Sequence, residues 1–163
     1  MPIRPEPGSR VATDPHTSSA VCIPPHKRVK SIALVGAGGL LGAPLRYQLG
    51  VWFPHTSGAF PAATFAINIT GAFLLGILLE GLTRLGPDTD WRRYVRLGVG
   101  TGALGAFTTY STLAVDTDLL LRGHHWSVAA GYATGTVVAG LVATATGIAV
   151  AARVRSRRSE PSA

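Results

Sequence analysis

Four long apolar stretches, joined by short polar connections, dominate the pattern of hydrophobic and polar residues along this chain. A helix needs about 20 mostly apolar residues to cross the hydrocarbon core of a bilayer, whereas buried strands of soluble proteins have only about 4–8. The pattern therefore predicts an all-α membrane protein with four transmembrane helices. These spans are expected at residues 31–53, 59–85, 96–116 and 126–152, after a disordered polar tail at 1–30 and before a basic tail at 154–163.

The third apolar stretch is the least typical of a continuous helix. It combines glycines with a cluster of hydroxyl residues: Gly102, Gly105, Thr108, Thr109, Ser111 and Thr112. Glycine and threonine are poor helix formers, and hydroxyl groups compete for backbone carbonyls. The third helix is therefore expected to break between 102 and 113, although a continuous glycine-rich packing helix fits the composition equally well. Backbone freed at this depth has to face protein or a cavity, where its carbonyls suit a hard cation such as Na⁺.

Two polar side chains lie inside otherwise apolar spans. Asn68 occupies the middle of FAINITGAFLLG, where an unpaired amide is costly, so it is expected either to bond another helix or to line a pore. Arg46 either extends to the lipid headgroups or creates a positive potential that attracts anions to a vestibule. Glycines spaced four residues apart predict close packing between helices. They are Gly38 with Gly42 and Gly131 with Gly135.

Positive charge is concentrated on one side of the predicted four-helix arrangement. The chain has 15 Lys and Arg against 8 Asp and Glu, a net charge of +7. The side that holds both termini and the second loop carries Lys27, Arg28, Lys30, Arg84, Arg92, Arg93, Arg96, Arg153, Arg155, Arg157 and Arg158. By the positive-inside rule, both termini are expected in the cytoplasm, in a multi-pass protein of the inner (plasma) membrane. The basic residues form no stripe interleaved with aromatics, so no nucleic-acid partner is expected.

Three motifs occur in order on the first three spans. They are GGLLGAPLRY at 38–47, FAINITGAFLLG at 65–76 and GALGAFTTYSTLAVD at 102–116. Over about residues 31–153 the chain resembles the CrcB/Fluc fluoride channels, and the ordered succession of motifs makes this resemblance specific. It implies an antiparallel, inverted dimer with two fluoride pores and a structural Na⁺ at the dimer centre, held by backbone carbonyls.

The resemblance also implies roles for individual residues. Gly105 and Thr108 correspond to the Na⁺ ligands, acting through their backbone carbonyls. Asn68 corresponds to the pore asparagine and Arg46 to the arginine near the pore entrance. Asp116 stands where the family usually has a glutamate, and Tyr132, Thr136 and Gly140 fall on the polar track of the fourth helix. Fluoride is strongly hydrated, so a pore must replace water with donors and positive edges. Candidates for this role are Asn68, Thr109, Tyr110, Ser111, Thr112 and Thr136.

The chain departs from the family motif at two pore positions. The motif normally has phenylalanines where this chain has Tyr110 and Leu113. A tyrosine keeps an electropositive ring edge that can face an anion, whereas Leu113 has no ring to offer. Together with the charge bias, this departure favours an inverted homologous subunit as the partner over a homodimer. The expected function is passive export of fluoride from the cytoplasm.

Two other functions fit parts of the sequence. A proton-coupled exporter would need a titratable carboxylate at membrane depth, and Glu80, beside Arg84, is the nearest candidate. A non-conducting accessory subunit would use Asn68 and the hydroxyl residues only to join helices. An enzyme is not expected, because Ser111 has no His and Asp placed to form a catalytic triad.

Overall fold

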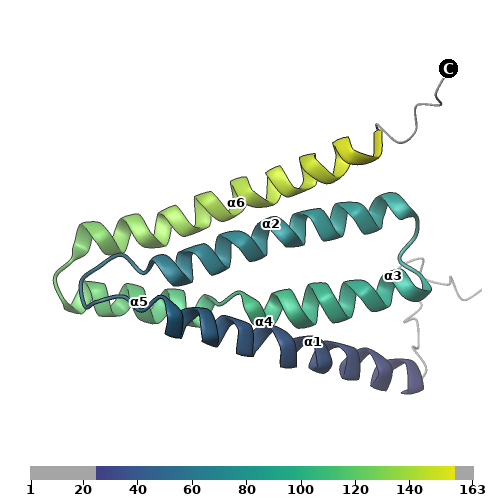
Figure 1. The fold of residues 1–163 in the computed structure, drawn as a ribbon, viewed down its shortest axis with the longest axis horizontal. Helices are drawn as coiled ribbons and strands as arrows, with labels where there is room; N and C mark the ends of the chain where they lie inside the picture. Colours follow the sequence, from purple (N-terminus) through teal and green to yellow (C-terminus); the bar gives the residue numbers. More distant parts are fainter. Residues whose placement is uncertain (1–24, 157–163) are drawn as a thin grey trace, which may run out of the picture.

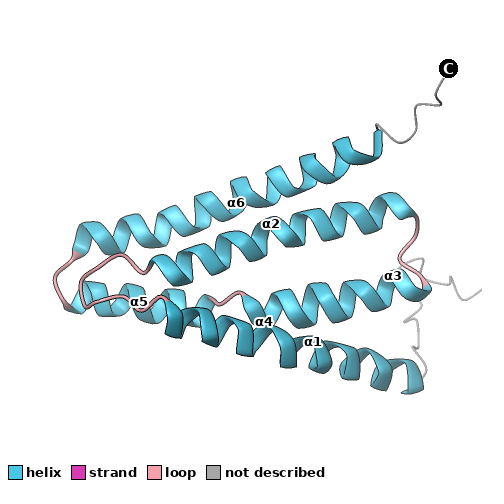
Figure 2. Cartoon of the chain, viewed as in Figure 1, coloured by secondary structure: helices cyan, strands magenta, loops and turns pink. Residues whose placement is uncertain are grey.

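The structure is a computed structural model that describes residues 25–156, and these form helices and connecting loops without any strand (Figures 1 and 2). The elements are α1 (Pro25–Trp52), α2 (Ala62–Leu85), α3 (Asp90–Val95), the π-helical segment η1 (Arg96–Leu104), α4 (Gly105–Phe107), α5 (Tyr110–Arg122) and α6 (Trp126–Ser156). Most of the two predicted tails, residues 1–24 and 157–163, lies outside the described residues.

The helices form an elongated bundle made of two pairs. Helix α2 packs along α6, and α1 packs along η1 and α4 (Figure 1). Segments α3, η1, α4 and α5 follow one another along a single direction, so that together they run about as far as the long helices beside them (Figure 1). Helix α5 also contacts α6, which joins the two pairs at one end of the bundle.

Two helices of the described chain are long and apolar enough to cross a membrane. They are α2 and the Trp126–Val154 part of α6, with mean hydropathies of 2.0 and 1.9. Most of the apolar surface of these helices is not buried within the chain, since only 22% and 6% of the respective windows are buried. A helix whose apolar face finds no cover within its own chain needs lipid or another subunit around it.

The first helix begins earlier than the sequence pattern predicts. It starts at Pro25, so residues 25–30, which were expected in the disordered tail, are helical. Proline suits the first turn of a helix, where its missing N–H costs nothing, and the following Lys and Arg residues are good helix formers. Likewise, α6 continues to Ser156, past the predicted end of the fourth span at residue 152.

Close contact between α1 and η1 depends on glycines. A Cβ atom added at Gly42 would lie 2.0 Å from the Ala103 carbonyl oxygen, and one at Gly38 would lie 2.0 Å from that of Gly98. These positions therefore let two backbones approach, as predicted. Gly131 and Gly135 differ, because added Cβ atoms there would meet open space in this chain. Their expected packing against another helix does not occur within the described residues.

A Gly42→Ala substitution is expected to lower the stability of the folded chain in detergent by about 1–3 kcal/mol or more, because the methyl group would collide with backbone that cannot move aside. Gly36→Ala is the matched control, since its methyl would enter open space on the same helix. The loss of helical circular dichroism on heating measures both variants. Equal midpoints for the two variants would contradict the close approach.

Candidate functional site

The candidate site is built around a break in the third apolar segment. Helix α4 ends at Phe107 and α5 begins at Tyr110. Between them, Thr108 has φ −74° and ψ 158°, and Thr109 has φ −148° and ψ 119°, so both are extended. The structure thus places the interruption inside the hydroxyl cluster, three residues after Gly105.

Asn68 of α2 pairs with the backbone at this break. Its Oδ1 accepts from the Thr109 N–H at 2.8 Å, and its Nδ2 donates to the Thr109 carbonyl oxygen at 3.1 Å. The side-chain amide thereby replaces the partner that a continuous helix would supply to the Thr109 N–H, and it gives a second donor to the Thr109 carbonyl, which as N-cap also accepts the first bond of α5. Because lipid offers no substitute for these bonds, Asn68 allows extended backbone to exist between the helices.

The same break releases carbonyl oxygens from their helical donors, including those of Gly105 and Thr108. In a continuous helix, the N–H of residue i donates to the carbonyl of residue i−4, so Thr109 would donate to Gly105 and Thr112 to Thr108. Here the Thr109 N–H donates to Asn68, and the Thr112 N–H donates to the Thr109 side-chain oxygen at 3.1 Å. The two residues that the family resemblance assigns to Na⁺ are therefore among residues 105–108, whose carbonyls lose their helical donors at the break.

Thr109 also organises the hydroxyl cluster. Its Oγ1 caps the N-terminus of α5, lies 3.2 Å from the Ser111 Oγ and donates to the Thr112 Oγ1 at 3.0 Å. Such a cap satisfies an N–H that the first turn of a helix leaves without a partner. Thr109 is buried, while Ser111 is exposed and Thr112 is half-buried. The cluster thus runs from the interior at Thr109 outward.

Two cavities meet at Thr109. The first, of about 410 Å³, is lined among others by the predicted residues Asn68, Gly105, Thr108, Thr109, Tyr110, Leu113, Thr136 and Gly140. The second, of about 330 Å³, contains Arg46, Thr109 and Thr112. The structure therefore brings most of the candidate residues into one groove and places Arg46 on the other side of Thr109. Ser111 lines neither of these cavities and contacts the site through Thr109.

Tyr110 and Leu113 have different surroundings although both line the first cavity. The Tyr110 side chain is 83% exposed, so its ring edge is open to whatever lies beside the groove. Leu113 is half-buried and packs against the cluster formed by Leu120, Ala129 and Tyr132. Leu113 therefore contributes to the core of the bundle as well as to the wall of the groove.

The fourth-helix residues are more enclosed than an open polar track would be. Tyr132 is fully buried, and its hydroxyl donates to Asp116 at 3.2 Å. The Thr136 hydroxyl donates to the Tyr132 carbonyl at 2.6 Å, although Thr136 still lines the first cavity. Only its hydroxyl oxygen is then free to accept, so Thr136 must change its hydrogen bond before it can donate to an anion.

Asp116 forms a second polar cluster that the sequence did not reveal. It is 6% exposed and accepts hydrogen bonds from Thr64 at 3.0 Å and from Tyr132. His55 Nε2 lies 3.9 Å from its other oxygen. Thr64 could have been found, because it lies one helical turn before Asn68 on the same face of α2. His55 lies in the loop before α2, where no periodicity indicates its position.

These features define a helical membrane protein with a broken helix and a polar groove beside the break. The family model described as "CrcB-like protein, Camphor Resistance (CrcB)" matches residues 33–148. The chain therefore belongs to the CrcB family, a family of transporters rather than enzymes.

Several curated relatives are similar over most of this chain. "Fluoride-specific ion channel FluC 3" of Streptomyces avermitilis is 47% identical over 127 residues, which are 78% of this chain and 61% of that relative's length. "Fluoride-specific ion channel FluC 2" of Leifsonia xyli subsp. xyli is 45% identical over 83% of this chain and 92% of its own length. "Fluoride-specific ion channel FluC 1" of Mycolicibacterium paratuberculosis is 39% identical, over 79% and 96%.

Asn68→Ala is expected to destabilise the protein, because it leaves the Thr109 N–H without its partner and removes one of the donors to the Thr109 carbonyl. The loss should be about 1–3 kcal/mol, measured as the free energy of unfolding in detergent. Thr70→Ala is the matched control, since Thr70 is an exposed polar residue of the same helix. If Asn68→Ala and Thr70→Ala had the same free energy of unfolding, a structural role for the Asn68 amide would be contradicted.

Proposed function

We propose that this chain is a subunit of a fluoride-selective channel that passively exports fluoride from the cytoplasm. The observation that carries the proposal is the Asn68-held break, which opens into a groove lined by an amide, hydroxyls and an exposed tyrosine. The relatives are fluoride-specific ion channels by name, which supports fluoride as the permeating ion.

The groove offers the groups that a dehydrated fluoride needs. An asparagine amide has two N–H bonds, and only one of those of Asn68 is used by the Thr109 carbonyl. The exposed ring edge of Tyr110 is electropositive, and Arg46 on the far side of Thr109 raises the local potential for an anion. These donors replace water without a net positive charge inside the groove, so an anion can both enter and leave.

A passive pathway agrees better with the carboxylates than a proton-coupled exporter does. Glu80 pairs with Arg84 one turn further along α2, and it does not line the groove beside the break. Asp116 accepts hydrogen bonds from Thr64 and Tyr132 and is likewise not among the groove residues. Neither carboxylate is therefore placed to exchange a proton for an ion held beside Asn68.

The proposal includes a structural Na⁺ held by the Gly105 and Thr108 carbonyls. The residues fit such an ion, because a hard cation prefers oxygen ligands and both carbonyls have lost their usual helical donors. The described residues contain no cluster of three or more His, Cys, Asp or Glu side chains, so backbone oxygens are the appropriate ligands to test. Bound there, Na⁺ would fix the two carbonyls at the break.

The channel is proposed to be an antiparallel dimer of four-span subunits, with both termini of this chain in the cytoplasm. Large apolar side chains are exposed on α1 and α6, including Leu40 at 77% and Leu141 at 68%. These surfaces need lipid or a partner subunit. Tyr110 is similarly exposed beside the groove, so a partner there would complete the wall. The charge bias favours an inverted homologous subunit over a homodimer.

Fluoride efflux from liposomes tests the proposed pathway. Tyr110→Leu is expected to slow efflux up to about tenfold, because an electropositive ring edge contributes roughly 0.5–1.5 kcal/mol. Tyr110→Phe keeps the edge and should conduct like the parent. Both variants should remain folded, because Tyr110 is exposed in the chain. Equal rates for all three proteins would remove Tyr110 from the pathway.

The efflux assay is run on the chain alone and together with an inverted homologous subunit. Conduction by a stable dimer of this chain alone would contradict the need for a different partner. Absence of fluoride efflux from both preparations would contradict the channel function itself.

The Na⁺ site predicts a cation-dependent stability of the assembled protein. Replacing Na⁺ by the bulky N-methyl-D-glucamine cation should lower the free energy of unfolding in detergent by about 2.7 kcal/mol if Na⁺ was present at a hundredfold excess over its Kd. K⁺ at the same ionic strength is the control. Identical thermal midpoints in all three salts would argue against a Na⁺ ligated by Gly105 and Thr108.

A further inference from the structure

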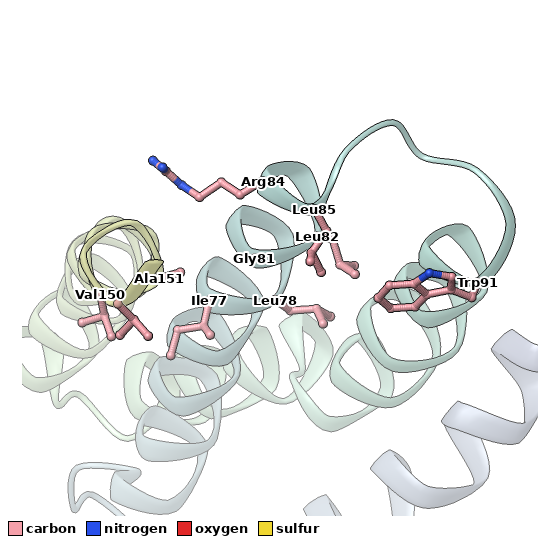
Figure 3. A pocket seen from close by; sticks show the side chains of 10 residues that line it. Ile77, Leu78, Gly81, Leu82, Arg84, Leu85, Trp91, Val150 and Ala151 are labelled. Atoms are coloured by element: carbon pink, nitrogen blue, oxygen red, sulfur yellow. The ribbon is translucent and has the colours of Figure 1, made fainter. Parts of the chain in front are cut away.

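A second groove lies at the opposite end of α2 from the His55 loop. It has a volume of about 760 Å³ and is formed by the last turns of α2, by α3 and by the end of α6. Its walls are almost wholly apolar: Ile77, Leu78, Leu82, Leu85, Trp91 and Val150. In Figure 3, the leucines of α2 extend toward Trp91, and Arg84 extends outward from the end of α2.

Two arginines near this groove are already used to hold the α2–α3 loop. Arg92 donates to the Leu85 carbonyl at 2.6 Å and to the Thr89 hydroxyl at 3.3 Å. Arg96 donates to both oxygens of Asp88. The bonded Arg96 guanidinium holds the pKa of Asp88 below its ordinary value, so this pair stays ionised. These two side chains are therefore not available to an outside ligand.

Two other arginines remain available beside the groove. Arg84 lines it and bonds Glu80 of its own helix through Nε alone, so within the described residues its terminal N–H groups have no hydrogen-bond partner and can bind an outside anion. Arg153 is exposed, and within the described residues no bonding partner is found for its side chain. It lies on α6 between Ala151 and Val154, which both line the groove, and one turn after Val150.

We propose that this groove binds an anionic phospholipid, with an acyl chain against the leucines and Trp91 and with the headgroup phosphate on Arg84 and Arg153. The proposal rests on the proposed placement of α2 and α6 in a membrane, and it does not depend on fluoride conduction. The groove lies at the end of the bundle where basic residues gather, which faces the anionic leaflet when the termini are cytoplasmic.

Charge and composition select this occupant over others. A zwitterionic lipid fills the apolar walls equally well but brings its own cation to the two arginines. An anionic headgroup instead supplies a counter-charge for Arg153, and arginine binds phosphate through several N–H donors, so Arg84 can bind it while its Nε pairs with Glu80. Trp91 has the amphipathic ring that is typical of the membrane interface. It therefore marks the depth at which the headgroup and the first methylenes meet.

Trp91 is also the reporter for the test. The chain has three tryptophans, and the other two, Trp52 and Trp126, lie at the end of α1 and the start of α6. A Trp52→Phe/Trp126→Phe protein therefore reports on this groove alone. It is reconstituted in phosphatidylcholine vesicles containing small fractions of acyl-brominated phosphatidylglycerol or of equally brominated phosphatidylcholine. Brominated phosphatidylglycerol is expected to quench Trp91 at an at least about fivefold lower fraction.

Arginine variants assign the headgroup contact. Arg84→Gln/Arg153→Gln should abolish the preference for the anionic lipid, whereas Arg122→Gln should keep it, because Arg122 is an exposed arginine at the other end of the bundle. Equal quenching of Trp91 by the two lipids would overturn the proposal, because it would show that the groove holds boundary lipid without preference for its charge. If neither lipid quenched Trp91, the proposal would also be overturned, because a second copy of the protein would then cover the groove. Fluoride efflux, measured on the same vesicles, tests the channel function separately.

Discussion

The pairing of Asn68 with the backbone of Thr109 is the interaction on which the rest of the site depends. A helix interrupted at membrane depth exposes backbone polar groups that lipid cannot satisfy. The Asn68 amide satisfies the Thr109 N–H, adds a donor to the Thr109 carbonyl and thereby makes an extended Thr108–Thr109 backbone possible. Asn68, a single side chain of α2, thus determines the backbone conformation at residues 108–109 in the third segment.

Several features follow from that constraint. Because Thr109 turns its N–H toward Asn68 and its hydroxyl toward Thr112, the carbonyls of Gly105 and Thr108 lose their helical donors. Glycines in α1 let η1 come close enough to support the segment just before the break. The groove beside Asn68 and the cavity containing Arg46 then share Thr109 as a common wall. The amide that holds the break together also lines the groove through which we propose that fluoride passes.

Features fixed by local chemistry could be predicted from the sequence. An amide in an apolar run must find a partner, and a Gly- and Thr-rich segment is weakly helical, so Asn68 and the region of the break stood out. Which backbone group Asn68 bonds could not be predicted, because it depends on the register between α2 and the third segment. The enclosure of Tyr132, the position of His55 and the open space beside Gly131 depend on tertiary packing in the same way.

Solid-state NMR of the chain in lipid bilayers tests the central claim most directly. The measurement combines the backbone chemical shifts of Thr108 and Thr109 with the through-space transfer between the Asn68 side-chain nitrogen and the Thr109 carbonyl carbon. Extended shifts at both threonines together with that transfer are the predicted result. Helical shifts that continue without interruption from 105 to 113, with no transfer from Asn68, would contradict it.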